Sequence, residues 1–335
     1  MRSVVGGFGG HGPAAGRTPS RSQRGRGAPR WIGVLHPGEM GSFVAWAARK
    51  GEGDAEVLWA SAGRSEATRQ RAEADGLGDA GSVAALAARS GIILSVCPPH
   101  AATEIARTVA GLGFGGVFVD ANAIAPATAR AIGAIVEAGG ARFVDGGLIG
   151  NPARGDGDQP PRLYLSGPQD EVAQVAALFA GSPLEALPVA GDAGAASALK
   201  MSYAAWTKGS AALLMAIRAT AAAEGVDEAL LAEWAYGQPD APSRSDRALR
   251  GTPRKAWRWV AEMEEIAATL QAAGLPAGFH QAAAEVYRRL ERHKDATSPP
   301  APEAVIADLL QAGSGSSAGG EPAPAGRRAP GSGSG

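Results

Sequence analysis

The chain has 335 residues, with 32 basic and 33 acidic side chains and a formal net charge of −1. This length suggests two domains with a substantial core, and the balanced charge gives no support for a protein that binds nucleic acid or a membrane surface. The single cysteine, Cys97, excludes an intramolecular disulfide and a cysteine-only metal site, and it fits a reducing cytoplasm, where we expect the protein to reside. The five histidines are scattered without the spacing of metal ligands, so no metal site is expected.

Both ends of the chain have the composition of disordered segments. Residues 1–30 are rich in Gly, Pro, Ser and Arg and have no apolar run long enough for a secretory signal. Residues 296–335 contain SPPAPE and GSGSSAGGEPAPAG, with one short helical run expected around 302–311. We therefore expect the chemistry to lie within residues 31–295.

The stretch 31–51 has the pattern of the first strand, turn and helix of a dinucleotide-binding unit. An apolar run leads into a Gly/Pro turn, and the apolar residues after the turn recur with helical spacing. In such a unit the amides at the start of the helix point at a pyrophosphate. Compared with G-x-G-x-x-G, the turn has a histidine at the first position and glycines at the other two; an ordinary turn with chance glycines is the alternative. The expected cofactor-binding residues of the turn are His36, Pro37, Gly38, Glu39, Met40 and Gly41.

The second strand, expected over 56–60, lacks the acidic residue that would bind a ribose 2′-hydroxyl. Instead, Arg64 and Ser65 stand where the next helix begins. A guanidinium and a hydroxyl suit charge-assisted hydrogen bonds to a 2′-phosphate, which predicts NADP(H) rather than NAD as the cofactor. A solvated helix start is the alternative.

Two further strands are expected to end at the ligand-binding edge of the sheet. The apolar run 92–96 is typical of a buried parallel strand and is closed by Cys97 and Pro98. We interpret Cys97 as a small buried residue beside the cofactor rather than as a nucleophile. Asn122 follows the next strand, where its amide can reach a nicotinamide ribose or a substrate; an Asx-turn or a helix cap is an equally open alternative.

The alternation of strands and helices continues to residue 190. It predicts an α/β fold, a doubly wound parallel sheet of the Rossmann type that binds NADP. Within it, the segment DGGLIGNPARG predicts a loop in which Gly146 and Gly147 permit close approach of a substrate or form a tight turn.

Residues 191–295 predict an all-helical domain for substrate binding and dimerisation. The segment is rich in alanine, and apolar residues recur with helical spacing over 195–224, 227–236, 254–273 and 277–293. The first helix is too long and too apolar for a surface helix, so we expect it to be buried on several sides. Apolar faces of this extent usually need a partner, and we expect a homodimer in which the helical domains pack together.

Lys200 and Lys208 lie inside the first long helix. Eight residues correspond to about 80° around a helix, so both lysines can border one cleft. A lysine on a largely apolar helix is costly unless it is paired or functional, although a lysine that extends to solvent is the alternative for either one. They are therefore candidate catalytic residues, and Tyr203 between them is a candidate substrate contact.

This order of parts, with the motifs HPGEMG, DANAIAP, DGGLIGNP and ALKMSYAAWTKGSAALL, resembles the β-hydroxyacid dehydrogenase superfamily over about residues 31–294. That superfamily is related to 6-phosphogluconate dehydrogenase and to imine reductases, and the motifs are most similar to a bacterial branch of 6-phosphogluconate-dehydrogenase-like NAD(P) oxidoreductases. The resemblance implies cofactor binding by Gly38, Met40 and Gly41, a 2′-phosphate at Arg64 and Ser65, and a proton donor or acceptor at Lys200.

The chain departs from the family at several expected positions. The asparagine one turn after the lysine is Ala204, the Ser-Thr pair that would hold a substrate carboxylate is Asn122 and Ala123, and a serine of the glycine motif is Ile149. An expected lysine-aspartate pair falls near Glu262 and Met263. The residues expected to bind the nicotinamide cofactor are kept, whereas much of the set expected to bind a substrate carboxylate is absent.

We therefore expect an NADP(H)-dependent oxidoreductase that transfers hydride between the nicotinamide and a small carbonyl or alcohol substrate. Lys200 would exchange the proton with the substrate, and Lys208 or Tyr203 is the alternative for this role. Asn122, Gly146 and Gly147 would line the substrate side of the site. An imine reductase is the first alternative, since an iminium already carries charge. A non-catalytic NADP-binding protein is the second.

Overall fold

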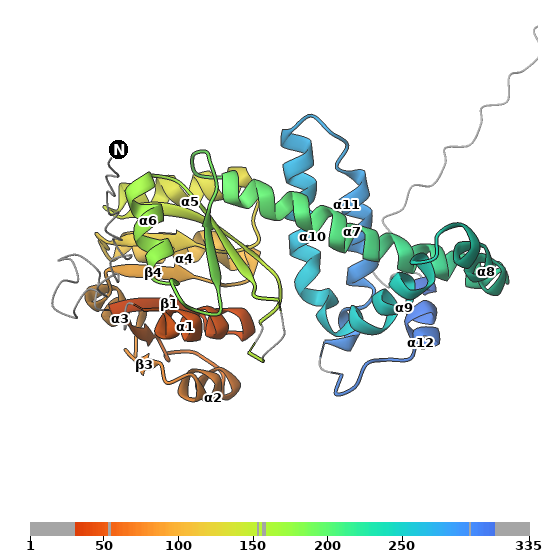
Figure 1. Cartoon of the computed structure of the whole chain (residues 1–335), viewed down its shortest axis with the longest axis horizontal. Coiled ribbons are helices and arrows are strands. Elements are labelled where there is room, and N and C mark those ends of the chain that lie inside the picture. The colour runs from red at the N-terminus through yellow and green to blue at the C-terminus, as the bar shows by residue number, and fades with distance from the viewer. Residues whose placement is uncertain (1–30, 53–54, 153, 156–158, 295, 312–335) are drawn as a thin grey trace, which may run out of the picture.

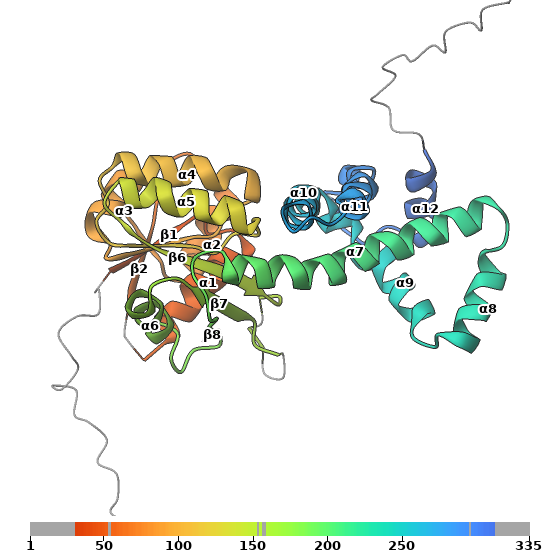
Figure 2. The ribbon, with the colours of Figure 1, turned by 90° about the horizontal axis from the view of Figure 1, so that it is seen from above.

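The computed structural model describes residues 31–52, 55–152, 154–155, 159–294 and 296–311. The tails 1–30 and 312–335, which the sequence predicts to be disordered, lie outside the described residues. A sheet with its covering helices forms one end of the molecule and helices alone form the other, with the long helix α7 (Ala195–Ala223) running from one to the other (Figures 1 and 2). None of the helices in the described ranges is long and apolar enough to span a bilayer.

Eight strands form one sheet in the order β3-β2-β1-β4-β5-β6-β7-β8. The pairs from β3 to β6 are parallel, β7 is antiparallel to β6, and β8 is parallel to β7. The chain order reverses at β1, which pairs with β2 on one side and β4 on the other; open α/β sheets bind ligands at such a switch point. The strand bounds are β1 (Trp31–Leu35), β2 (Glu56–Trp59), β3 (Gly78–Asp79), β4 (Ile92–Ser95), β5 (Val117–Asp120), β6 (Arg142–Ile149), β7 (Arg162–Ser166) and β8 (Glu185–Pro188).

Alternating apolar side chains supply a core on each face of the sheet. In β4, Ile92 and Leu94 join the core that α1 and α6 cover, whereas Ile93 joins the opposite core under α3, α4 and α5 (Figure 2). Both faces are therefore covered, which confirms the predicted doubly wound α/β sheet. The helices of this part are α1 (Glu39–Lys50), α2 (Glu66–Ala74), α3 (Val83–Arg89), α4 (Pro99–Gly111), α5 (Pro126–Ala138) and α6 (Gln169–Ala177).

The helical end has its own core around α7. Met201 and Met215 of α7 are fully buried together with Met263 and Tyr287 from two other helices. The helix α9 was not predicted from the sequence. Its segment APSRSDRALRG is largely polar, and only Ala241, Ser245, Ala248 and Leu249 are buried, on one face. The helices are α8 (Asp227–Gly237), α9 (Ala241–Gly251), α10 (Ala256–Ala272), α11 (Gly278–Arg288) and α12 (Pro302–Leu310), with short 3-10 turns at Pro253–Lys255 and Glu291–His293.

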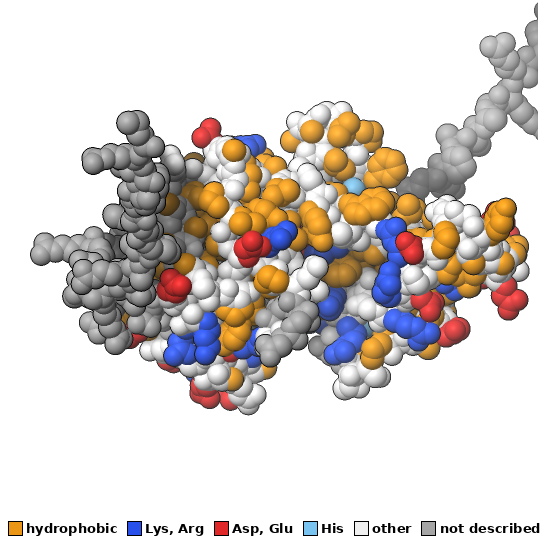
Figure 3. All heavy atoms as spheres, in the orientation of Figure 1, with side chains coloured by type: hydrophobic (Ala, Val, Ile, Leu, Met, Phe, Trp, Pro, Cys, Tyr) orange, Lys and Arg blue, Asp and Glu red, His pale blue; other side chains and the backbone are white. Residues whose placement is uncertain are grey.

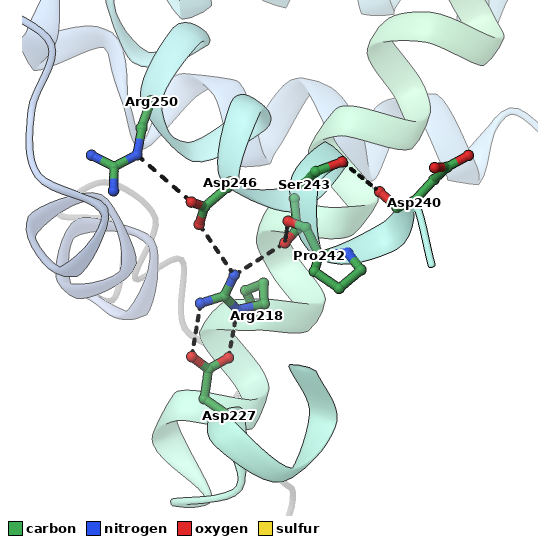
Figure 4. A network of polar contacts seen from close by, with 8 residues as sticks. Arg218, Asp227, Asp240, Pro242, Ser243, Asp246 and Arg250 are labelled. Carbon is green, nitrogen blue, oxygen red and sulfur yellow. Dashed lines mark hydrogen bonds and ion pairs between the residues drawn. The ribbon is translucent and has the colours of Figure 1, made fainter. Parts of the chain in front are cut away.

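A buried arginine ties α7 to the two helices that follow it. Arg218 donates to both carboxylate oxygens of Asp227, at 2.5 and 2.8 Å, and to Ser245 Oγ at 3.0 Å (Figure 4). This pairing matters for α8, because no residue of α8 is itself buried. The charged contact therefore helps to hold the start of α8 against α7.

The glycine motif is a strand where the sequence predicts a loop. β6 extends to Ile149, and Gly146 and Gly147 pair with Leu165 and Tyr164 of β7. Glycine is rare inside strands unless a neighbouring backbone approaches closely. Gly146 lies close to the backbone of β5, and Gly147 lies close to the backbone of α7.

The helix α7 is buried on several sides but keeps one apolar stripe exposed. The prediction of a central helix fits the faces packed against α9, α10, α11 and α12. On the remaining face hydrophobic side chains gather along α7 (Figure 3). They are Leu199, Tyr203, Trp206 and Leu213, between 37% and 66% exposed.

Candidate active site

The turn between β1 and α1 lies at the switch point of the sheet and has the shape that a phosphate-binding turn needs. Gly38 precedes the first residue of α1, and a methyl group built on it would meet nothing within 4 Å, so the space beside it is open. A methyl group on Gly41 would collide with the carbonyl oxygen of His36. Gly41 is therefore required by the tight turn, whereas Gly38 leaves room for a ligand to approach the backbone.

His36 occupies the first fingerprint position with a backbone conformation that favours glycine. Its φ is 65°, the one positive value among the described non-glycine residues. Burial, reinforced by the charge of Arg64, lowers the pKa of His36 to about 4, so the imidazole is neutral at pH 7. Its buried Nδ1 has no hydrogen-bond partner within the described part of the chain, so one polar atom of the turn is unsatisfied.

Arg64 and Ser65 follow β2 at the same edge, but only one of them is available to a ligand. Ser65 is the N-cap of α2, and its Oγ accepts from the amide of Thr68 at 3.4 Å. Arg64 is near enough to His36 to act on its pKa, and burial lowers the pKa of Arg64 itself. The buried Nε of Arg64 has no partner among the residues described, so the guanidinium keeps one unsatisfied donor just after β2.

Cys97 and Pro98 end β4 beside this turn. Burial and then the charge of Asp120 raise the pKa of the Cys97 thiol to about 12, so the thiol stays protonated and is no nucleophile. Pro98 precedes α4 as its N-cap residue. Both residues therefore shape the edge of the sheet rather than supply a reactive group.

Asn122 has its polar atoms engaged inside the protein. Its Oδ1 accepts from the amide of Cys97 at 2.5 Å, and its Nδ2 donates to Ser95 at 3.2 Å and to Asp120 at 2.8 Å. Asn122 is 3% exposed. The side chain joins the ends of β4 and β5, which is neither the Asx-turn nor the helix cap weighed from the sequence, and it leaves little of the amide for a ligand.

A buried aspartate that the sequence did not single out anchors α7 to the sheet. Asp145 of β6 accepts hydrogen bonds from the amides of Gly194 and Ser197, both at 2.9 Å, and from the Ser197 hydroxyl at 2.5 Å. A carboxylate at a helix N-terminus satisfies amides that have no partner in the helix. The only sequence signal was an aspartate at the end of a strand.

Gly146 and Gly147 pack against backbone instead of lining open space. A methyl group on Gly146 would lie 3.0 Å from the carbonyl oxygen of Asp120, and one on Gly147 would lie 2.6 Å from that of Ala196. The Gly147 methyl would also lie 3.1 Å from Lys200 Cβ. The substrate contact expected at these glycines is therefore replaced by a packing role, which sets Lys200 directly against β6.

Two lysines share one buried carboxylate at the side of α7. Lys200 Nζ lies 3.7 Å from Glu262 Oε1, and Lys208 Nζ is paired with Glu262 Oε2. The Lys208 ammonium also lies 5.0 Å from the centroid of the Trp259 ring. The three side chains are nearly closed to solvent, with 15%, 19% and 6% exposure for Lys200, Lys208 and Glu262.

Burial and charge act in opposite directions on this cluster. Burial lowers the pKa of Lys208 to about 8, although Glu262 opposes the change. Burial disfavours the charged form of Glu262 as well, but the two lysines outweigh it and hold the pKa of Glu262 below its usual range. At neutral pH the cluster thus contains an ionised Glu262, and the amine of Lys208 titrates near neutral pH. A group that titrates near the working pH can exchange a proton.

Tyr203 lies outside the lysine cluster. It is 49% exposed and belongs to the apolar stripe of α7. The structure does not bring its hydroxyl to Glu262, so it is not part of the constellation that joins the two lysines.

One face of α10 connects the lysine cluster to the sheet. Arg258 donates to Glu39 at 3.0 Å, Glu262 pairs with the lysines, and Glu265 accepts from the amide of Ala125 at 2.6 Å. Residues at i, i+4 and i+7 share one helix face. Glu265 also accepts from the Thr128 hydroxyl at 3.0 Å and so caps the start of α5. This face of α10 therefore contacts the start of α1, the lysines of α7 and the start of α5.

No group of three His, Cys, Asp or Glu residues that could hold a metal ion occurs in the described ranges. The unsatisfied guanidinium nitrogen of Arg64 and the open space beside Gly38 at the start of α1 fit an anionic nucleotide.

Comparisons with known proteins agree with this architecture. A family model described as a domain of unknown function (DUF1932) matches residues 221–290. No curated protein sequence gives a significant match.

Solved structures match over most of the chain. A conserved hypothetical protein from Sinorhizobium meliloti 1021 is 27% identical with a TM-score of 0.58, over 84% of this chain and 96% of that one. A conserved protein of unknown function, described as structurally similar to 3-hydroxyacid dehydrogenases, is 24% identical with a TM-score of 0.58, over 79% and 98% of the two chains. The 3-hydroxyisobutyrate dehydrogenase of Mycobacterium tuberculosis with L-serine is 17% identical with a TM-score of 0.61, over 84% and 99%. The chain therefore has the fold of the 3-hydroxyacid dehydrogenases, which confirms its resemblance to the β-hydroxyacid dehydrogenase superfamily.

Proposed function

We propose that this chain is an NADP(H)-dependent oxidoreductase that interconverts a small carbonyl compound and its alcohol. The observation that carries the proposal is the buried Lys200–Glu262–Lys208 cluster, which joins α7 to α10 and begins where Lys200 packs against β6. When bound there, the nicotinamide supplies or accepts the hydride. The protein must then supply or remove the proton on the substrate oxygen.

Lys200 is the better placed of the two lysines for this proton. It stands against β6 at the sheet edge, whereas Lys208 lies about 12 Å further along the helix axis. Glu262 binds Lys208 closely and Lys200 at 3.7 Å, so the Lys200 ammonium can turn to a substrate oxygen without losing its counter-ion. Glu262 is the counter-ion of Lys200, and the charge of Lys208 stabilises the ionised Glu262.

Arg64 supports NADP(H) over NAD(H). Its guanidinium is partly buried at the end of β2, carries an unsatisfied Nε, and has no acidic residue beside it at the position that would bind a ribose hydroxyl. A guanidinium binds a 2′-phosphate through charge-assisted hydrogen bonds. Ser65 contributes less directly, since its hydroxyl caps α2.

The first test is a titration of the purified protein with NADPH and with NADH, followed by cofactor fluorescence, in wild type and Arg64→Ala. We expect tight NADPH binding that the variant loses, while NADH binding changes little. A wild-type protein that binds neither nucleotide contradicts the proposed function. Lys200→Met should then retain NADPH binding and lose turnover; an active Lys200→Met protein would remove Lys200 from the mechanism.

Reduction of a C=N bond is a second candidate, because the site offers little for a substrate carboxylate. Ala123 is apolar and packs against the helical core, Asn122 is engaged within the sheet, and Ile149 has no hydrogen-bonding side chain. An iminium also needs no strong acid at the site. Turnover of cyclic imines without turnover of hydroxy acids would favour this candidate, and no hydride transfer to any carbonyl or imine in a broad panel would favour a non-catalytic NADP-binding protein.

We also propose that the chain forms a homodimer through α7. The exposed stripe of Leu199, Tyr203, Trp206 and Leu213 runs along about four turns of one helix, and contiguous exposed apolar surface marks sites of protein–protein contact. Light scattering on wild type and Trp206→Glu tests this: a dimer that the variant converts to a monomer supports the interface, and a wild-type monomer excludes it.

A further inference from the structure

One positive side chain of the helical end reaches the turn where the cofactor phosphates are expected. Arg258 of α10 donates from Nη1 to Glu39 Oε2 at 3.0 Å, and Glu39 is the first residue of α1. Figure 3 shows Lys and Arg side chains gathered near the region where α9 meets α10. The helical end therefore brings positive charge to the phosphate-binding turn of the sheet.

Glu39 is surrounded by cations. The hydrogen bond from Arg258, followed by the charges of Arg258, Lys255 and Arg71, holds the pKa of Glu39 below its usual range despite partial burial. Arg71 also donates from Nε to the carbonyl oxygen of Pro37 at 3.4 Å. Three cations around one carboxylate leave an excess of positive charge next to the open space at Gly38. Such an excess suits an anionic ligand.

Arg258 lies between the phosphate-binding turn and the lysine cluster. Its charge contributes to the lowered pKa of Lys208, so it stands near that lysine as well as near Glu39. Arg64 follows β2 and is near enough to His36 of the same turn to lower its pKa. Arg258 therefore reaches the turn at Glu39, and Arg64 reaches it at His36.

We propose that Arg258 binds the pyrophosphate of the nicotinamide cofactor and that Glu39 holds the guanidinium in position until the nucleotide takes its place. This inference rests on the proposed function. A guanidinium matches the oxygens of a phosphate through two parallel hydrogen bonds. The Arg258–Glu39 pair is 38% and 66% exposed, and exposed pairs of this kind contribute little stability, so the exchange costs the protein little.

The pyrophosphate is common to NADPH and NADH, which distinguishes Arg258 from Arg64. We expect Arg258→Ala to weaken both nucleotides by the same factor, about tenfold or more, as for the loss of a charged hydrogen bond. Arg64→Ala should weaken NADPH alone. Glu39→Gln should tighten both nucleotides, because it removes the competing carboxylate and a negative charge beside the phosphates.

The experiment measures the dissociation constants of NADPH and NADH by cofactor fluorescence in the full-length chain. Arg250→Ala is the matched control, since Arg250 is an exposed arginine of α9 paired with Asp246. Thermal unfolding of each variant shows that it is folded; if Arg258→Ala is not, Glu39→Gln carries the test alone.

The results separate the two proposals. Unchanged binding in Arg258→Ala, a loss confined to NADPH, or weaker binding in Glu39→Gln each overturns the role of Arg258 while the proposed function stands. A wild-type chain that binds neither nucleotide overturns the proposed function and this inference with it.

Discussion

The ammonium of Lys208 and the carboxylate of Glu262 form an ion pair inside the protein, with side chains 19% and 6% exposed. Removing one partner of a buried pair leaves the other charge without compensation, which costs far more than the pair contributes. Glu262 serves two lysines, so its loss would leave two desolvated ammonium groups side by side.

Glu262→Gln should therefore lower the free energy of unfolding by about 3–5 kcal/mol at pH 7. Urea denaturation measures the change. Glu264→Gln is the matched control on the same helix, because the exposed Glu264–Arg288 pair contributes about 1 kcal/mol at most. Equal effects of the two substitutions would show that Glu262 does not hold the lysines.

Lys208 predicts a rise of stability at alkaline pH. Its pKa is about 8 in the folded chain, where the side chain is buried, against an ordinary value of 10.5 in the unfolded chain. Between these pH values the unfolded chain therefore binds one proton more than the folded chain. The free energy of unfolding rises with pH wherever the unfolded state binds more protons. Wild type should gain stability from about pH 8 to about pH 10 relative to Lys208→Met, as measured by urea denaturation at each pH. Lys255→Met, at an exposed lysine, should follow the wild-type profile.

Asp120 predicts the opposite slope at acidic pH. Burial raises its pKa from 3.8 to about 7, so the folded chain binds the additional proton between these values. The stability due to Asp120 is complete below about pH 4 and is lost as the pH rises towards 7. The difference in unfolding free energy between wild type and Asp120→Asn should decrease over this range. A difference that stays constant with pH would contradict a protonated Asp120.

Gly147 tests the contact between β6 and α7. Its added methyl group would lie 2.6 Å from a backbone oxygen of α7 and 3.1 Å from Lys200 Cβ, and backbone cannot turn aside as a side chain can. Gly147→Ala should cost about 1–3 kcal/mol or more of stability, as in other overpacked interiors. Gly115→Ala is the control, since a methyl group there meets nothing within 4 Å. Thermal unfolding of both variants measures the difference in stability. Equal melting temperatures would show that α7 does not pack closely against Gly147.

The sequence predicted the sheet because its signals are local. Strands such as β4 are continuous apolar runs, and the turn after β1 contains the glycine that the backbone needs at Gly41. The direction of β7 and the extension of β6 through Gly146 and Gly147 were not predictable, because a local pattern reveals neither strand direction nor which neighbour will approach a glycine.

The site was predicted less completely than the fold. Lys200 and Lys208 follow from an unusual charge on an apolar helix, but their counter-ion does not. The segment EMEE contains Glu262, Glu264 and Glu265, of which one is buried between the lysines, one is exposed, and one caps α5. These roles depend on how α10 is rotated against the sheet, which tertiary packing decides.

The three contacts of α10 with Glu39, the lysines and α5 depend on a single helical register. An α-helix turns by about 100° for each residue, so one residue inserted between Arg258 and Glu262 would leave Arg258 in place and swing both carboxylates away from their partners. Deleting one residue there would rotate both carboxylates away from their partners in the opposite direction. The segment from Arg258 to Glu265 should therefore tolerate substitutions at its exposed positions but no change in length.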